Sequence, residues 1–120
     1  AQHNLAILYL RGKGVAKNFK RAVYWFEKSA RNGDAESMFD LGLCHSLGEG
    51  TAKVPAKALR WYKRSAEAGS ILGQLALGMA YAEGMGTRPN LKKARRWLTI
   101  AALRGNEEAI DWLNEDGSRN

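Results

Sequence analysis

The sequence predicts an all-α fold, a solenoid in which a 36-residue helix-turn-helix unit is repeated along the chain. Two observations predict it. Tryptophan, glycine, alanine and leucine recur at one fixed spacing, and the chain is rich in alanine and leucine with only two prolines among 120 residues, as helices require. The recurring sets are Trp25, Trp61 and Trp97; Gly12, Gly48 and Gly84; Gly14, Gly50 and Gly86; Gly33, Gly69 and Gly105; Ala22, Ala58 and Ala94; Ala30, Ala66 and Ala102; and Leu5, Leu41, Leu77 and Leu113.

Each unit contains two helices separated by glycine-containing turns. A Gly-x-Gly loop follows the first helix and a single glycine ends the second, since glycine adopts the left-handed conformation that stops a helix. A polar residue that can cap the next helix follows the single glycine in every copy. The first helices are expected at 1–11, 35–47 and 71–83, the second at 19–31, 55–67 and 91–103, and the N-caps at Asn18, Asp34, Ser70, Asn90 and Asn106. Val54 is a poor cap, but Pro55 then suits the first helical position.

A fourth copy begins at Glu107, and its repeat pattern ends after Leu113 in a polar tail. We therefore expect a single domain, 1–120, with repeat 1 at 1–33, repeat 2 at 34–69, repeat 3 at 70–105, and a capping helix and tail at 106–120. Because the chain opens at Ala1 inside an expected helix, we expect it to derive from a longer chain or to have a processed N-terminus.

These motifs resemble the Sel-1-like repeat (SLR) family, a relative of the tetratricopeptide repeats. Its pattern is approximately A-x-x-x-L-G-x-x-Y-x-x-G-x-G-V, then D-x-x-K-A-x-x-W-Y-x-K-A-A-x-x-G. The departures are local, with His45 in place of Tyr, Val54 in place of the capping Asp and Leu98 in place of the second aromatic. The second copy matches through Leu41, Gly42, Gly48, Gly50, Lys57, Ala58, Trp61, Tyr62, Lys63, Ala66 and Gly69. The paired cysteines of the cysteine-rich branch are absent, since Cys44 is the single cysteine.

The resemblance implies a right-handed α-α superhelix with first helices on the concave side and second helices on the convex side. Family members are usually scaffolds or adaptors, so it also implies protein–protein interaction rather than a reaction. The recurring alanines permit close helix packing, and we expect the three aligned tryptophans to fill the space between repeats. Loss of one should then cost ~3–5 kcal/mol. A ligand-binding stripe of tryptophans is the less favoured alternative.

Charge is divided unevenly between the two kinds of helix. The second helices carry twelve of the 19 lysines and arginines and only two acidic residues, Glu27 and Glu67. The first helices, with the fourth copy, carry six acidic residues, and Arg11 is their only base. This predicts a basic convex surface and a mildly acidic, partly apolar inner groove. The basic surface is either simply solvated or a site for an acidic partner, polyanion or anionic membrane.

The candidate partner-binding residues lie on the first helices, outside the expected core stripe. Exposed leucine and methionine beside a carboxylate suit a protein or peptide with apolar anchors and a basic residue. Alternatively, these side chains pack on a neighbouring helix. The candidates are Asn4, Ile7, Asp40, Leu43, Leu47, Met79 and Glu83.

Groups that catalysis would require do not form a constellation. His3 and His45 are the only histidines, and we expect His45 to be a packed side chain. Cys44 and His45 are adjacent, so on a helix they point about 100° apart. The Gly-x-Gly loops lack the Lys-Ser/Thr of a phosphate loop. We expect no enzyme activity, cofactor, metal or small-molecule substrate.

Several alternatives stay open. No apolar run approaches the roughly 20 residues of a membrane span, although a membrane surface remains an alternative partner. Nucleic acid is less favoured, since the aromatics that would stack on bases are expected in the core. The chain could instead be the regulatory part of a larger protein. The sequence leaves the compartment open between bacterial cytoplasm and cell envelope.

Overall fold

The structure, a computed structural model, describes the backbone of residues 19–119 and the side chains of residues 19–115. The helices in this range are α2 (Phe19–Arg31), α3 (Ala35–Leu47), α4 (Pro55–Glu67), α5 (Ile71–Glu83), α6 (Leu91–Leu103) and α7 (Glu107–Arg119). The bounds of α2 to α6 confirm the five helices that the repeat pattern predicts there. The first helix expected, at 1–11, and the N-cap Asn18 lie outside the described residues.

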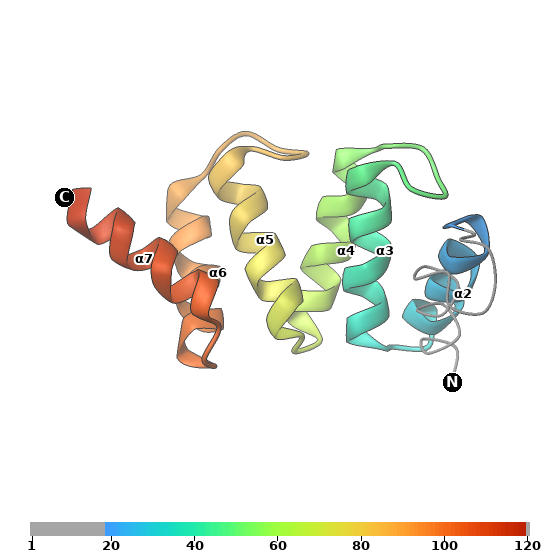
Figure 1. Cartoon of the computed structure of the whole chain (residues 1–120), viewed down its shortest axis with the longest axis horizontal. Coiled ribbons are helices and arrows are strands. Elements are labelled where there is room, and N and C mark those ends of the chain that lie inside the picture. Colours follow the sequence, from blue (N-terminus) through green and yellow to red (C-terminus); the bar gives the residue numbers. More distant parts are fainter. Residues whose placement is uncertain (1–18, 120) are drawn as a thin grey trace.

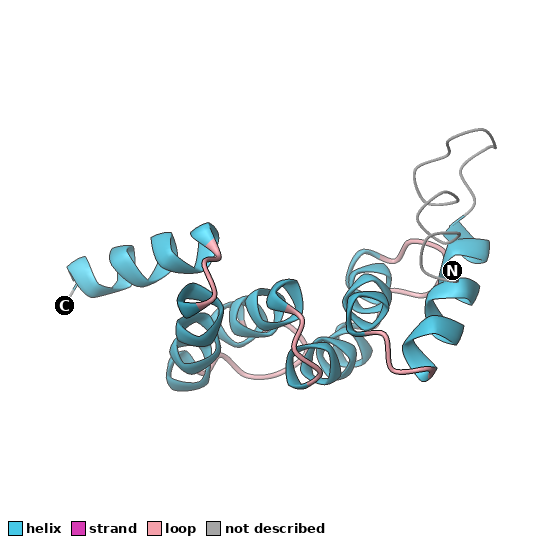
Figure 2. Ribbon diagram, turned by 90° about the horizontal axis from the view of Figure 1, so that it is seen from below, coloured by secondary structure: helices cyan, strands magenta, loops and turns pink. Residues whose placement is uncertain are grey.

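Successive helices alternate in direction and stack into an elongated array with principal extents of 49 × 27 × 24 Å (Figure 1). The array bends into an arc, and α3 and α5 lie toward its open side (Figure 2). In agreement with this curvature, α3 and α5 pack directly on one another, whereas α2 and α4 approach much less closely. The second helices are therefore splayed apart on the outer side, which leaves room for a groove between them.

The predicted glycine stops and N-caps of the helices are confirmed at most helix ends. Gly48 and Gly84 end α3 and α5 in the left-handed conformation, with φ of 73° and 78°. Three of the predicted caps accept a backbone N–H with the side-chain oxygen: Ser70 from Gly73, Asn90 from Lys93 and Asn106 from Ala109, at 3.0, 3.0 and 2.9 Å. Pro55 occupies the first turn of α4 beside the uncapped Val54.

Asp34 precedes α3, but the prediction that its side chain caps the helix is wrong. Its Oδ2 instead accepts hydrogen bonds from the hydroxyls of Ser29, at 3.0 Å, and Ser37, at 2.6 Å. The carboxylate thus joins the end of α2 to the first turn of α3. Oδ2 of Asp34 accepts from side chains instead of from the backbone N–H groups of α3, because two hydroxyl donors lie within hydrogen-bond distance.

The last helix is longer than the repeat pattern indicates. The pattern ends after Leu113, but the backbone of α7 stays helical to Arg119. None of the intervening residues is a proline, and their polar composition is compatible with a solvated helix. The end of a repeat pattern therefore marks the end of shared packing and not the end of the helix.

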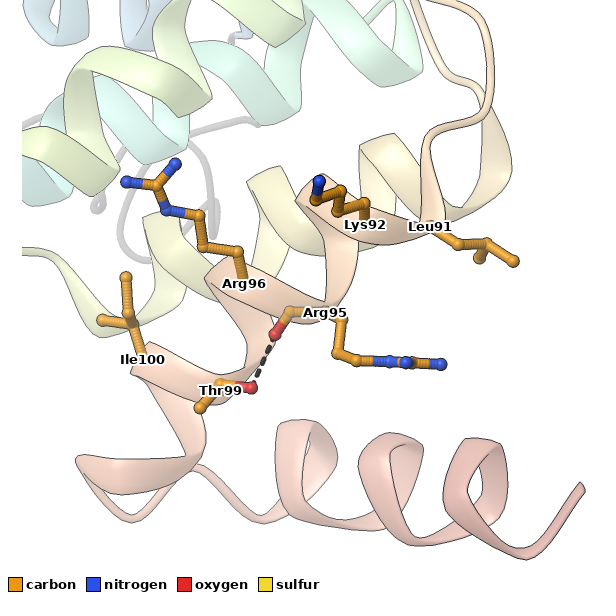
Figure 3. A pocket seen from close by; sticks show the side chains of 6 residues that line it. All are labelled: Leu91, Lys92, Arg95, Arg96, Thr99 and Ile100. Carbon is orange, nitrogen blue, oxygen red and sulfur yellow. Dashed lines mark hydrogen bonds between the residues drawn. The ribbon is translucent and has the colours of Figure 1, made fainter. Parts of the chain in front are cut away.

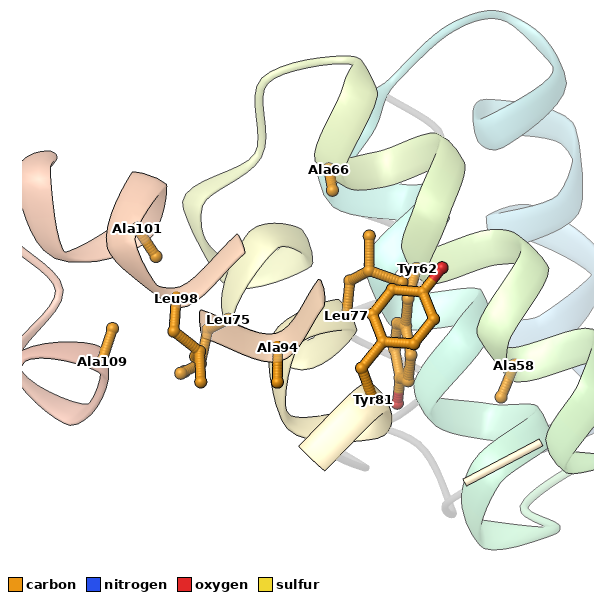
Figure 4. Packing of buried hydrophobic residues seen from close by; sticks show 10 residues of the cluster. All are labelled: Ala58, Tyr62, Ala66, Leu75, Leu77, Tyr81, Ala94, Leu98, Ala101 and Ala109. Atoms are coloured by element: carbon orange, nitrogen blue, oxygen red, sulfur yellow. The ribbon is translucent and has the colours of Figure 1, made fainter. Parts of the chain in front are cut away.

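The core runs along the array as two clusters, and the larger one joins α4, α5, α6 and α7 (Figure 4). Leu77 and Leu98 are fully buried in it, and Tyr62 and Tyr81 are 3% and 8% exposed. The aligned tryptophans pack against the core clusters, as expected, but they do not fill the space between repeats. The position after each tryptophan is the buried one, occupied by Phe26, Tyr62 and Leu98, while Trp25, Trp61 and Trp97 are only partly buried at the edges of the clusters.

The second glycine of each Gly-x-Gly loop makes an approach between repeats. A Cβ atom on Gly50 would collide with the carbonyl oxygen of Phe19 at the start of α2, and one on Gly86 with that of Pro55 at the start of α4. Both glycines also have a φ of 74°, which side-chain-bearing residues rarely adopt. The first glycine therefore ends a helix, and the second seats the loop on the preceding repeat.

Candidate functional site

The predicted partner-binding residues that the structure describes lie along α3 and α5, the helices on the open side of the arc. In each helix the spacing i, i+4, i+7, i+11 places four residues on one face. Leu43 and Leu47 are 36% and 56% exposed, and Glu83 is exposed. We call this the α3–α5 surface and define it by Glu36, Asp40, Leu43, Leu47, Leu72, Ala76, Met79 and Glu83.

The candidates are not equally accessible. Asp40 and Met79 are only partly buried, but Met79 packs against the larger core cluster and so contributes mainly to stability. Asn4 and Ile7 lie outside the described residues. Leu72, which was not predicted, is 43% exposed on the same face of α5. Extending the helical spacing one turn back from Ala76 would have found it.

A second feature lies between the second helices, where the side chains of α2 and α4 line a groove of about 610 Å³. We call it the α2–α4 groove. Five cationic side chains line it against two carboxylates, and the half-buried Trp61 forms part of its wall. The lining residues are Glu27, Arg31, His45, Thr51, Lys57, Arg60, Trp61, Lys63, Arg64 and Glu67.

Only a few of these charges are engaged with one another. Glu27 and Arg31 form an ion pair at 3.9 Å within α2, and the guanidinium of Arg64 lies 5.2 Å from the ring centroid of Trp61. Within the described part of the chain, Lys57, Arg60 and Lys63 have no carboxylate at ion-pair distance. The groove therefore carries an excess of positive charge that is not neutralised locally.

His45 reaches this groove from the end of α3. Its side chain is 6% exposed, which confirms the expectation of a packed histidine, yet its Nδ1 has no hydrogen-bond partner among the described residues. Burial, reinforced by the charge of Lys57, lowers the pKa of His45 below its ordinary value, against the opposing effects of the Ala52 backbone and of Glu27. The imidazole is thus favoured in its neutral form beside a cationic groove.

The neighbouring Cys44 does not form a reactive pair with His45. The thiol is 4% exposed, and burial, together with the charges of Asp40 and Glu49, raises its pKa to about 12. A thiol with such a pKa stays protonated at neutral pH and is a poor nucleophile. Among the described residues there is also no cluster of three or more His, Cys, Asp or Glu side chains suited to a metal ion.

A third feature is a hollow of about 650 Å³ that lies on α6 alone (Figure 3). Thr99 uses its hydroxyl internally, since it donates to the carbonyl of Arg95 at 2.6 Å. Arg95 occupies the register of Val23, which is buried, and Leu59, which packs on the core. This side of α6 is therefore the face that α2 and α4 use for packing within the stack. Leu91, Lys92, Arg95, Arg96, Thr99 and Ile100 line the hollow.

The helix pairs, the fixed repeat length and the two open surfaces define a helical-repeat protein of the α-solenoid class. The Sel1 repeat matches residues 1–34, 35–70 and 71–106, and the chain belongs to this family. The family is typically non-catalytic, and its repeats generally mediate protein interactions. Of the helices that the structure describes, none has the length and hydrophobicity to cross a membrane.

Two solved structures are similar to the chain. Protein c5321, a protective antigen present in uropathogenic Escherichia coli strains that displays an SLR fold, matches with a TM-score of 0.95 and 32% identity over 98% of this chain and 25% of its own. A Sel1 repeat protein from Oxalobacter formigenes matches with a TM-score of 0.85 and 36% identity over 90% of this chain and 44% of its own. The chain thus spans less than half of either protein. No curated protein matches it.

Proposed function

We propose that the chain is a scaffold or adaptor module that binds a partner protein or peptide on the α3–α5 surface. The observation that carries the proposal is the exposure of three leucines on adjacent first helices. Leu43, Leu47 and Leu72 are 36%, 56% and 43% exposed although α3 and α5, the helices that carry them, contact one another. Apolar side chains gathered on one surface and bordered by polar residues are typical of interaction sites.

The chemistry of the surface indicates the kind of partner. Glu36 and Asp40 lie on the first half of α3, before the two exposed leucines, and Glu83 ends α5. Apolar anchors with a basic residue nearby would match this arrangement, since leucines accept apolar side chains and the carboxylates attract a cation. A helical or extended segment of another protein fits these requirements better than a small polar molecule.

The test is an affinity capture from a lysate of the source organism, at low and at high salt, with mass spectrometry of the retained proteins. The surface variant is Leu43→Ser with Leu47→Ser. The matched control is Leu91→Ser with Leu103→Ser, because these two leucines of α6 are also exposed, at 55% and 83%, but lie elsewhere. Both variants should keep the thermal stability of the wild type within about 0.5 kcal/mol, as expected of surface changes.

A protein retained at high salt by the wild type and the control, but lost from the surface variant, supports the proposal. Retention that is equal in all three proteins contradicts it, because the partner would then dock elsewhere. Retention that disappears at high salt in the wild type also contradicts it. Contacts with leucines that become buried on binding are not screened by salt, whereas charge pairs are.

A further inference from the structure

We infer that the α2–α4 groove is a second binding site, specific for a carboxylate-rich peptide segment of another protein. The groove lies between second helices and is separate from the α3–α5 surface, so either proposal stands without the other.

The groove depends on one departure from the repeat pattern. At the next junction the register of His45 is occupied by Tyr81, which is 8% exposed, and Nζ of Lys93 lies 5.3 Å from the centroid of its ring. Lys93 has the same register as Lys57. At the junction of Tyr81 the phenol ring fills this position and is covered by Lys93. At the junction of His45 the smaller imidazole leaves the equivalent space beside Lys57 open.

The polar floor of the groove also points to a ligand. His45 is more than nine-tenths buried, lines the groove, and keeps an Nδ1 atom without a partner among the described residues. A buried polar atom without a hydrogen bond costs free energy unless a ligand or water satisfies it. Thr51 adds a hydroxyl to the same lining. The site thus offers hydrogen-bonding groups together with cations.

The charge of the groove favours an anionic ligand whose negative groups are separated from one another. Five cationic side chains face two carboxylates, so the groove is complementary to acidic groups. Glu27 and Glu67 would repel a continuous phosphate backbone, whereas they can accept hydrogen bonds from the N–H groups of a peptide. An Asp- or Glu-rich peptide satisfies both kinds of lining residue, and an arginine fork pairs well with each carboxylate.

The shape excludes a broad surface. A volume of about 610 Å³ is the size of a small-ligand site and holds a few side chains. A flat bilayer would meet the rim of the groove but not His45, which is almost fully buried. The other junctions differ in chemistry, since Thr99 and Ile100 on α6 stand at the registers of Lys63 and Arg64 on α4.

The experiment measures fluorescence anisotropy of a short fluorescein-labelled peptide rich in Asp and Glu, titrated with the full chain at low salt. The site variant is Lys57→Glu with Arg60→Glu. The matched control is Lys92→Glu with Arg96→Glu on α6, which makes the same change in net charge outside the groove. We expect the site variant to weaken binding about tenfold or more and the control to weaken it less than about threefold.

A third variant separates shape from charge. His45→Tyr installs the residue of the equivalent register, keeps the net charge and fills the groove, so it should weaken binding while thermal unfolding confirms the fold. Leu43→Ser with Leu47→Ser should leave binding unchanged. Equal losses in the site variant and the charge-matched control would overturn the inference, as would unaltered binding by His45→Tyr.

Two further arms test the chemical class of the occupant. One uses a single-stranded oligonucleotide of the same net charge as the peptide, and the other uses phosphatidylserine vesicles. Weaker binding of both, or binding that the site variant and the control affect equally, is the expected result. Tighter binding of either probe that depends on Lys57 and Arg60 would overturn the assignment to an acidic peptide.

Discussion

Gly78 in α5 lies directly against Leu98 in α6: a Cβ atom added to the glycine would stand 2.6 Å from Cγ of the leucine. Gly42 has the same register in the preceding repeat, and a Cβ atom added to it would stand 2.7 Å from the ring of Tyr62. A glycine inside a helix is normally unfavourable, so its presence at both positions is explained by the side chain that faces it.

Gly78→Ala is therefore expected to lower the stability of the protein. Overpacking costs about 1–3 kcal/mol, and it is opposed by about 1 kcal/mol of improved helix propensity. In a Leu98→Ala background the same change should become neutral or stabilising, because the facing side chain is gone. Denaturant unfolding of the four proteins of this double-mutant cycle gives the coupling energy. Additive effects would show that the two residues do not oppose each other.

Tyr62 and Trp61 allow the buried and the partly buried aromatic position to be compared on one helix. Tyr62 is 3% exposed in the core, whereas Trp61 lines the α2–α4 groove. We expect Tyr62→Ala to cost about 3–5 kcal/mol and Trp61→Ala to cost clearly less, although tryptophan is the larger residue. Urea unfolding measures both losses, and the reverse order would mean that the tryptophan register carries the core.

His45 should make stability depend on pH in one direction. Its pKa in the folded protein lies below 6.5, its ordinary value, so the unfolded chain binds the proton more readily. The contribution of His45 is complete above the unfolded pKa and is lost as the pH falls from there toward the folded pKa. Comparing thermal unfolding of the wild type and His45→Tyr between about pH 8 and about pH 5 should isolate this loss. Parallel curves for the two proteins would contradict it.

Cys44 should be nearly inert toward thiol reagents in the folded protein. Its pKa of about 12 leaves very little thiolate at neutral pH, and the side chain is buried. Reaction with an aromatic disulfide reagent should be slow without denaturant and fast in urea. As a control, the rate in urea should equal that of a free cysteine under the same conditions. Rapid modification of the folded protein would show that the thiol is accessible or ionised.

The repeat spacing was sufficient to predict the fold, because glycines and capping residues mark the ends of the helices. The bounds of α3 and α5 follow from Gly48, Gly84 and the residues before each helix. The same spacing could not say which side chains are buried. Trp61 and Tyr62 both lie at positions of the repeat pattern that carry large apolar residues. Adjacent residues on a helix point about 100° apart, and only the neighbouring helices decide which one enters the core.

The candidate sites were accessible to sequence reasoning to different extents. Helical spacing placed Leu43 and Leu47 on an open face, and it would have included Leu72 had the stripe been extended. The α2–α4 groove could not be predicted, because its lining side chains come from α2, α3, α4 and the loop before α4. We attribute its open space to the difference in size between His45 and Tyr81. Spacing within one helix contains no information on such a difference.

The seating of Gly86 on the start of α4, repeated by Gly50 on the start of α2, has an evolutionary consequence. Each loop lies close to a backbone carbonyl, which every residue type carries, so this contact does not depend on the type of side chain at that position. A duplicated segment of one repeat would therefore make the same loop-to-backbone contact wherever it was inserted in the array. Arrays of this kind can lengthen in whole steps, while the side chains on their surfaces diverge independently and acquire different partners.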